Sequence, residues 1–321
     1  MVRRRGDRHR QVHRCHGRQG EVILRPGPVA VAAPAGGCYN PGVIIDFHSH
    51  IFPPPLIAAR DKYLSDPCFR LLYSSHKARL AAADDLISEM DASGVNKAVI
   101  QNIGWASHDL CVRTNDYLLE AAARFPARLI PFIAVQPLAG TKALGEIERC
   151  AAAGARGVGE LRPDVQGFGL GDDRVIKPFV ETVAGNNLVL LLHADEPAGY
   201  AYPGKGAVTP GVLYPFIAAN PDLKLALAHW GGGLPFYALM PEVGAALKNT
   251  WFDSAATPYL YRPEVYERAA DLVGENRILF GSDWPLLGQR RCLDELKALN
   301  LSTQTLNAIL GGNAAALLGL E

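Results

Sequence analysis

Val43-Ile44-Ile45-Asp46-Phe47-His48-Ser49-His50 is the stretch on which the predicted fold and the predicted site both depend. Its apolar beginning is typical of a β-strand, and two histidines separated by one residue follow directly. Residues i and i+2 of a strand point to the same face, so His48 and His50 can aim two imidazoles at one point. Such a pair suits a divalent cation such as zinc. Alone the pair is weak evidence, and the rest of the chain has to support it.

Strand-like and helix-like segments alternate along the remainder of the chain. Eight strand-like runs, the first ending at His50, are each followed by a helix within residues 43–321. Several runs, such as 188–192, are continuously apolar, which suits parallel strands covered on both faces. The pattern predicts an α/β fold, a distorted (β/α)8 TIM barrel with extra C-terminal helices. A doubly wound sheet is the alternative, but no Gly-rich phosphate motif follows the first strand.

The boundaries of these elements follow from periodicity and from glycine or proline signals. The later strands are predicted at 97–101, 129–135, 156–161, 188–193, 224–229, 250–253 and 277–280. The helices are predicted at 82–93, 109–125, 141–153, 174–185, 210–220, 235–247 and 262–273, with three short helices at the end. The long connection 51–79 is either a lid or binding loop, or a surface excursion.

The first 42 residues differ from the rest in composition. Residues 1–25 contain eight arginines and two acids, and residues 26–42 are uncharged and rich in Pro, Gly and Ala. We expect 1–42 to be a disordered extension or a mis-assigned start, and 43–321 to form one barrel domain. Arg3-Arg4-Arg5 resembles an export signal, but no apolar segment follows it closely.

The overall composition is that of an ordinary globular protein. The chain has 321 residues, 49% hydrophobic and 20% charged, with a formal net charge of +0. Without the tail the charge is mildly acidic, and no apolar run approaches the roughly 18 residues of a membrane span. The six cysteines show no Cys-x-x-Cys spacing and indicate unpaired thiols in a reducing cytoplasm. We expect a cytoplasmic protein with a small-molecule substrate and no nucleic-acid or membrane partner, and a homo-oligomer is left open.

Polar residues follow the predicted strands at the positions where a barrel places its catalytic groups. Four of the nine histidines and two acids lie there: His48, His50, Glu160, His193, His229 and Asp283. Each alone has a simple structural explanation, since Glu160 can pair with Arg162 and Asp283 can cap a helix. Together at one barrel face they predict a metal site.

The residue types suggest how such a site would work. His48, His50 and His193 supply nitrogen ligands and Asp283 supplies an oxygen, which leaves a position for water. A bound metal lowers the pKa of that water toward roughly 7, and Asp283 can take its proton as general base. His229 is the second catalytic candidate, either on a second metal or as a donor to the developing oxyanion.

Two further residues are predicted to bind the substrate. Arg162 would lie at the barrel mouth as a clamp for a carboxylate, unless it only pairs with Asp164. Trp284 directly follows Asp283 and is the other candidate.

From Val43 to its end the chain resembles the amidohydrolase superfamily, and most closely its amidohydrolase-related branch. That branch includes metal-dependent hydrolases and aminocarboxymuconate-semialdehyde decarboxylase. The stretches that carry the resemblance are 45–50 (IDFHSH), 193–195 (HAD), 228–232 (AHWGG), 252–255 (FDSA), 278–285 (ILFGSDWP) and 309–315 (ILGGNAA). The resemblance implies a metal held by His48, His50, His193 and Asp283, with His229 beside the metal-bound water.

Glu160 departs from the pattern of this superfamily. Many of its hydrolases carry a carboxylated lysine on the fourth strand, whereas this chain has Glu160. The decarboxylase-like members need no acid there, but the stretch 157–161 is similar to TatD-type nucleases, in which a glutamate bridges two metals. Glu160 is therefore a candidate metal ligand, and a single-ion site with Glu160 as a supporting residue is slightly favoured.

These observations predict a metal-dependent hydrolase of amidohydrolase type that acts on a small amide, ester or lactone. The alternative is a metal-dependent, non-oxidative decarboxylase of an unsaturated or aromatic carboxylic acid. A nuclease ranks third because the folded part lacks a basic stripe. A catalytically dead barrel would lack ligands, and none is missing. The expected cofactor is a divalent metal, Zn2+ first and Mn2+ or another transition metal next, as one or two ions.

Overall fold

The computed structural model of the chain describes residues 42–320. The predicted extension at 1–42 lies outside the described residues, except for Gly42. Within the described part, no helix is both long and apolar enough to cross a membrane. The cysteines of this part, Cys68, Cys111, Cys150 and Cys292, are buried and unpaired.

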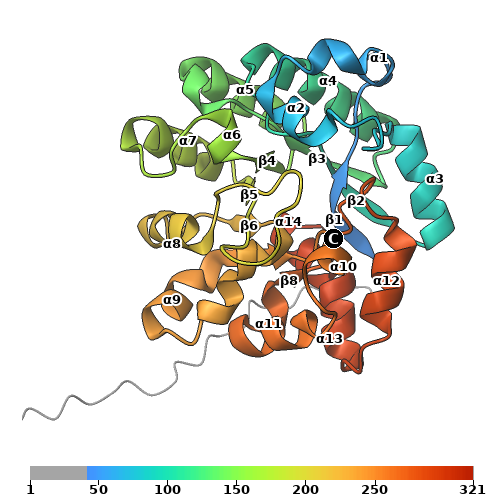
Figure 1. Cartoon of the computed structure of the whole chain (residues 1–321), viewed down its shortest axis with the longest axis vertical. Helices are drawn as coiled ribbons and strands as arrows, with labels where there is room; N and C mark the ends of the chain where they lie inside the picture. The colour runs from blue at the N-terminus through green and yellow to red at the C-terminus, as the bar shows by residue number, and fades with distance from the viewer. Residues whose placement is uncertain (1–41, 321) are drawn as a thin grey trace, which may run out of the picture. The chain divides into compact units, whose positions relative to one another are not determined.

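Eight parallel strands form one sheet in the order β1 to β8, and helices surround them (Figure 1). The strands are β1 (Ile45–His50), β2 (Lys97–Gln101), β3 (Leu129–Ile133), β4 (Gly157–Leu161), β5 (Val189–Leu192), β6 (Leu225–Leu227), β7 (Thr250–Asp253) and β8 (Ile278–Leu279). The last strand returns to the first, since Phe47 N donates to Phe280 O at 2.7 Å. The predicted TIM barrel is confirmed.

A buried carboxylate reinforces this closure between β1 and β8. Asp46 accepts hydrogen bonds from Ser282 N at 2.9 Å and from Gln289 Nε2 at 2.8 Å. These bonds hold the segment after β8, which carries Asp283, against the end of β1.

The helices lie close to the predicted ranges. The larger ones are α3 (Ala83–Ser93), α4 (His108–Arg124), α5 (Thr141–Ala152), α7 (Asp173–Gly185), α8 (Pro210–Ala219), α11 (Val265–Val273) and α12 (Gln289–Lys297). The shorter ones are α1 (Pro54–Ala58), α2 (Pro67–Tyr73), α6 (Pro163–Gln166), α9 (Pro241–Ala246), α10 (Thr257–Leu260), α13 (Thr303–Asn307) and α14 (Asn313–Leu318). Local signals set their ends: Asp172 caps the start of α7, and Gly94 with φ 82° ends α3.

The helix predicted at 235–247 is shorter in the structure, because its predicted start is wrong. A 3-10 segment, η3 (His229–Tyr237), follows β6, and α9 begins only at Pro241. Proline has no amide hydrogen to donate, so Pro241 cannot continue a helix from the preceding turn but suits a first helical position. Three successive glycines with positive φ, Gly231 to Gly233, shape the chain before it.

Two apolar layers enclose the strands. Inside the barrel a compact cluster forms from Ile45, Phe47, Val99, Ile130, Phe132, Val189, Leu191, Ala226, Ala228 and Leu279. The rings of Phe47 and Phe132 meet edge to face with centroids 5.5 Å apart. A side chain at Gly157 would clash with the Phe132 ring, so glycine is required there. The larger cluster lies between the strands and the helices.

Candidate metal centre

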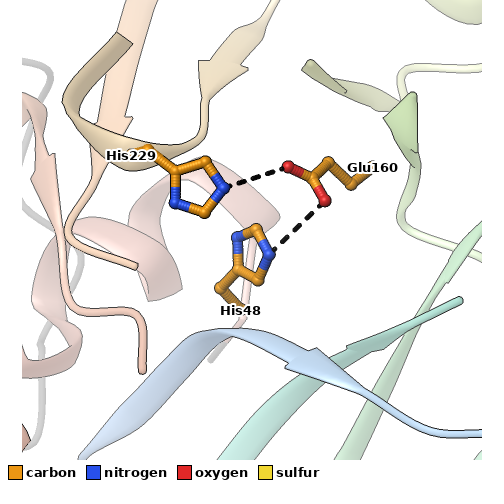
Figure 2. A group of neighbouring side chains, drawn as sticks. All are labelled: His48, Glu160 and His229. Atoms are coloured by element: carbon orange, nitrogen blue, oxygen red, sulfur yellow. Dashed lines mark ion pairs between the residues drawn. The ribbon is translucent and has the colours of Figure 1, made fainter. Parts of the chain in front are cut away.

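The six polar residues predicted at strand ends meet at one end of the barrel. His48 and His50 are on β1, Glu160 is on β4, and His193 follows β5 directly. His229 begins the segment after β6, and Asp283 lies beyond β8. Figure 2 shows how His48, Glu160 and His229 converge from three different elements. Parallel strands of a barrel bring their carboxyl ends to one face, which is why residues 235 positions apart in the chain share a site.

His48, His50 and Asp283 form one side of the centre. The Nε2 atoms of the two histidines are 3.0 Å apart, and Asp283 Oδ1 lies 3.3 Å from His50 Nε2 and 3.8 Å from His48 Nε2. Two ring nitrogens and a carboxylate oxygen therefore face a common point. His48 is fully buried and His50 is nearly so.

Glu160 lies between this side and a second pair of histidines. Its Oε2 is 3.7 Å from His48 Nε2 and 3.8 Å from His50 Nε2. Its Oε1 is 2.8 Å from His193 Nδ1 and 3.4 Å from His229 Nε2. Each oxygen of one carboxylate thus faces a different histidine pair, as Figure 2 shows for His48 and His229.

The outer nitrogens of three of these histidines are hydrogen-bonded. His48 Nδ1 lies 2.8 Å from Asp253 Oδ2, His193 Nε2 lies 3.2 Å from Asp195 Oδ1, and His229 Nδ1 lies 3.1 Å from Ala255 O. Such partners fix the ring orientation and the tautomer, and leave the other nitrogen facing the centre.

Asp253 and Asp195 were not among the predicted site residues, although the sequence contains a signal for each. Asp253 is the last residue of a predicted strand, and Asp195 is two residues after His193.

Two of the site residues have an uncommon backbone conformation. His229 has φ 55° and Asp283 has φ 66°, in the left-handed region that non-glycine residues rarely adopt. Backbone hydrogen bonds hold both: His229 N donates to Asp253 Oδ1, and Asp283 N donates to His48 O. The surrounding structure therefore determines where these side chains point.

The electrostatics of the cluster favour ionised carboxylates. Burial raises the pKa of Glu160, but the opposing effect of His193 and His48 is larger, so the pKa lies well below its usual value. Burial likewise opposes ionisation of Asp283, but its histidine neighbours lower the pKa overall. Burial lowers the pKa of His48 while Asp253 and Glu160 raise it to about 10, and Glu160 raises the pKa of His229 to about 9.

This donor set fits a divalent metal ion. Two groups of described residues hold ligand atoms close enough to share an ion: His48, His50 and Asp283, and His48, Glu160 and His229. Buried imidazoles and carboxylates that face one another without intervening lysine or arginine are the ligands that zinc and manganese use. The side chains present therefore match the predicted cofactor.

A cavity of about 300 Å³ opens above the centre. His50, Glu160, His193, His229 and Asp283 line its floor. Its walls are largely aromatic and apolar, formed by Leu72, Tyr73, Ala78, Tyr200, Tyr202, Pro203, Tyr259, Leu260, Pro285 and Leu286. Part of this wall belongs to the long connection 51–79, which therefore lines the site.

Of the two predicted substrate-binding residues, the structure places only Arg162 at this cavity. Arg162 is buried and donates to Gly204 O at 2.5 Å, and its Nε has no hydrogen-bond partner among the described residues. Its nearest acids are Asp164 and Asp195, at 3.7 and 3.8 Å. Trp284 does not line this cavity, because its side chain is buried in the hydrophobic core between strands and helices.

A family model described as "Amidohydrolase" matches residues 45–320. The chain belongs to the amidohydrolase family. It is thus an enzyme of the amidohydrolase superfamily, as the motifs predicted.

Among curated relatives, the L-fucono-1,5-lactonase of Burkholderia ambifaria is 27% identical, over 75% of this chain and 80% of the relative. The 2-amino-3-carboxymuconate-6-semialdehyde decarboxylase of Dictyostelium discoideum is 24% identical, over 86% of this chain and 92% of the relative. The solved structure of 5-carboxyvanillate decarboxylase from Novosphingobium aromaticivorans, complexed with manganese, matches with a TM-score of 0.71. That match has 20% identity and covers 87% of this chain and 96% of the other, and it supports the barrel fold.

Proposed function

We propose that this protein is a metal-dependent decarboxylase, which removes CO2 without oxidation from an aromatic or unsaturated carboxylic acid. The observation that carries the proposal is the cavity: aromatic and apolar walls above a cluster of metal-ligating side chains, with a buried arginine beside them. The relatives named as decarboxylases support this reading. It ranks above the hydrolase that the sequence pattern favoured.

The walls of the cavity suit a flat, conjugated substrate. Tyr73, Tyr202 and Tyr259 offer ring faces and edges against which an unsaturated system packs favourably. Arg162 lines the cavity, and a charge-assisted bond from its guanidinium to a carboxylate or a phenolate of the substrate would be strong where water is excluded. Arg162 is therefore proposed to orient the acid.

The proposed cofactor is one divalent ion, Zn2+ first and Mn2+ as the alternative. His48, His50 and Asp283 would hold it, with Glu160 or His193 completing the set. When bound, the ion would supply positive charge that anchors an anionic substrate and stabilises negative charge on it.

Loss of CO2 breaks a carbon–carbon bond and leaves its electron pair on the substrate carbon, which must then take up a proton. His229 lies on the cavity floor, and Glu160 raises the pKa of its imidazole to about 9, so that Nε2 can hold a proton at neutral pH. We propose that His229 gives its Nε2 proton to this carbon, and that the ionised Asp283 relays a replacement proton from water. The apolar walls limit competing water.

A hydrolase acting on a lactone, ester or amide is the second candidate, and a specific observation favours it. The two oxygens of Glu160 face separate histidine pairs, an arrangement that can bridge two ions. Two-ion sites of this kind serve hydrolysis, with Asp283 as general base. The similarity to a lactonase agrees with this alternative.

One experiment separates the two functions. The protein is freed of metal, reloaded with Zn2+ or Mn2+, and offered hydroxybenzoic acids, an unsaturated aliphatic acid and sugar 1,5-lactones. A decarboxylase releases CO2 from an acid, and in D2O it places one deuterium on the carbon that lost it. Ring opening of lactones without CO2 release from any acid would overturn the proposal. Two bound ions per chain, falling to one in Glu160→Gln, would strengthen the hydrolase.

A further inference from the structure

His50 differs from the other three histidines of the centre in its outer nitrogen. The outer nitrogens of His48, His193 and His229 have partners, whereas His50 Nδ1 is buried and has no hydrogen-bond partner among the described residues. A buried polar atom without a partner is rare in folded proteins and calls for an explanation.

Gln101 shows the same feature on the neighbouring strand. It is the last residue of β2, its exposed fraction is 0%, and neither its Oε1 nor its Nε2 has a hydrogen-bond partner in the described part of the chain. A buried primary amide with both atoms unpaired is a strong deviation, because the group can make several hydrogen bonds.

The register of the sheet brings these two residues together. His50 and Gln101 are Cα partners across the parallel strands β1 and β2, which are joined at this level by Ile51 N donating to Gln101 O at 3.0 Å. Partners on adjacent strands are about 4.8 Å apart, and their side chains point to the same face. Val99, two residues before Gln101, belongs to the cluster inside the barrel, so Gln101 also points inward.

We propose that Gln101 is a positioning residue for His50: its amide oxygen receives the Nδ1–H of His50 through one buried water. A single water can link two groups that lie near each other but have no direct hydrogen bond, and buried waters typically satisfy such atoms. Gln101 would thereby fix the ring orientation and the tautomer of His50, as Asp253 does for His48.

The contacts of the other ring nitrogen of His50, Nε2, decide that Nδ1 is the donor in this bond. His50 Nε2 lies 3.0 Å from His48 Nε2 and 3.3 Å from Asp283 Oδ1, so it faces the proposed metal position. A ligand nitrogen must carry a free lone pair, which requires the proton to be on Nδ1. Oε1 of Gln101, with the intervening water, is the acceptor that this tautomer needs.

A neutral partner is suited to this position. The centre already contains the carboxylates of Glu160 and Asp283, with Asp253 and Asp195 behind the histidines. A further carboxylate next to His50 would add a buried negative charge, whereas an amide orients the ring without one. The inference rests on the proposed metal site, but the tautomer of His50 can be measured without metal.

The test compares Gln101→Met, which removes the amide at similar volume, with Gln101→Glu, which restores an acceptor. Metal affinity is measured by competition with a chelator, and the tautomer of His50 by nitrogen-15 NMR of the metal-free protein. We expect Gln101→Met to bind metal about 10–100-fold more weakly and to lose the uniform Nδ1–H tautomer. Gln101→Glu keeps an acceptor at this position, so it should retain the Nδ1–H tautomer and bind metal more tightly than Gln101→Met does.

Val99→Ala is the matched control, since it removes packing one layer below on the same strand without removing a polar atom. It should lower stability but keep metal affinity and the tautomer. Wild-type affinity together with an unchanged tautomer in Gln101→Met would overturn the inference. A wild-type protein that binds no divalent metal would instead overturn the proposed function, and the NMR measurement would still decide the role of Gln101.

Discussion

The inside of the barrel has two layers, built by the same strands, and they differ in almost every physical property. The lower layer is apolar and fully packed, with Phe47, Val99, Phe132, Leu191 and Leu279 among its members. The upper layer, only one to four residues further along the strands, consists of the histidines and carboxylates of the proposed metal centre. In the lower layer burial stabilises the fold, whereas in the upper layer burial disfavours the charged form of every ionisable group.

In the upper layer, hydrogen-bond partners offset the cost of burying charged groups. Outer partners such as Asp253 orient the ligand histidines, and Glu160 shares its oxygens between two pairs. Side chains in the lower layer need no such partners and specify shape alone. We therefore expect substitutions in the upper layer to affect metal and rate, and substitutions in the lower layer to affect stability.

The largest expected effect is on turnover in Asp283→Asn. This change removes a proposed proton-handling group, so we expect the rate to fall by about 10²–10⁴-fold with little change in the melting temperature. Rates are measured on the substrate found in the screen, and Asp222→Asn, an exposed acid, is the control. Near wild-type turnover in Asp283→Asn would leave His229 as the group responsible.

In the lower layer, Phe132→Ala should cost about 3–5 kcal/mol of unfolding free energy. The ring is fully buried and packs against Phe47, so its removal leaves a cavity. Urea unfolding measures the loss, with Leu138→Ala at an exposed position as the control. If the folded variant also lost its metal, the two layers would not be separable.

Asp253→Asn tests the partners of the upper layer. The carboxylate accepts from His48 and fixes its tautomer, and we expect metal affinity to fall about 10–100-fold in Asp253→Asn. Asp195→Asn, which alters the partner of His193, makes a useful comparison. An unchanged affinity in Asp253→Asn would show that packing alone orients His48.

The smallest expected effect is the change of metal affinity with each unit of pH. His48 is a proposed ligand; burial lowers its pKa, but Asp253 and Glu160 raise it to about 10 in the metal-free protein, so a metal must displace its proton. Metal affinity should therefore rise with pH between about 6 and 9, by about tenfold or less per unit. Calorimetry in buffers of different ionisation enthalpy measures the protons released.

The raised pKa values of His48 and His229 predict how the stability of the metal-free protein depends on pH. Raised histidine pKa values contribute stability that is present below about 6.5 and is lost as the pH rises through about 9 to 10. Thermal melts of metal-free protein should therefore fall over that range. Metal-free melts that rise with pH there would contradict the raised values.

The sequence determined the fold class and which polar residues meet at one end of the barrel. Strand and helix periods are local properties, and eight of them in alternation leave few arrangements other than a barrel. Because parallel strands converge at their carboxyl ends, a residue's position at a strand end was enough to place His48, His50, Glu160, His193, His229 and Asp283 together.

Only the tertiary structure decided what each side chain faces. The partner of His48 is 205 residues away, and no local pattern states that Asp253 should meet Nδ1. Three further features likewise depend on rotamers and on packing across strands. They are the contacts of Glu160 with two histidine pairs, the burial of Trp284 in the core and the unpaired atoms of Gln101. A sequence pattern fixes the face and the end of a strand, but the direction of a hydrogen bond is set by neighbours that are distant in the chain.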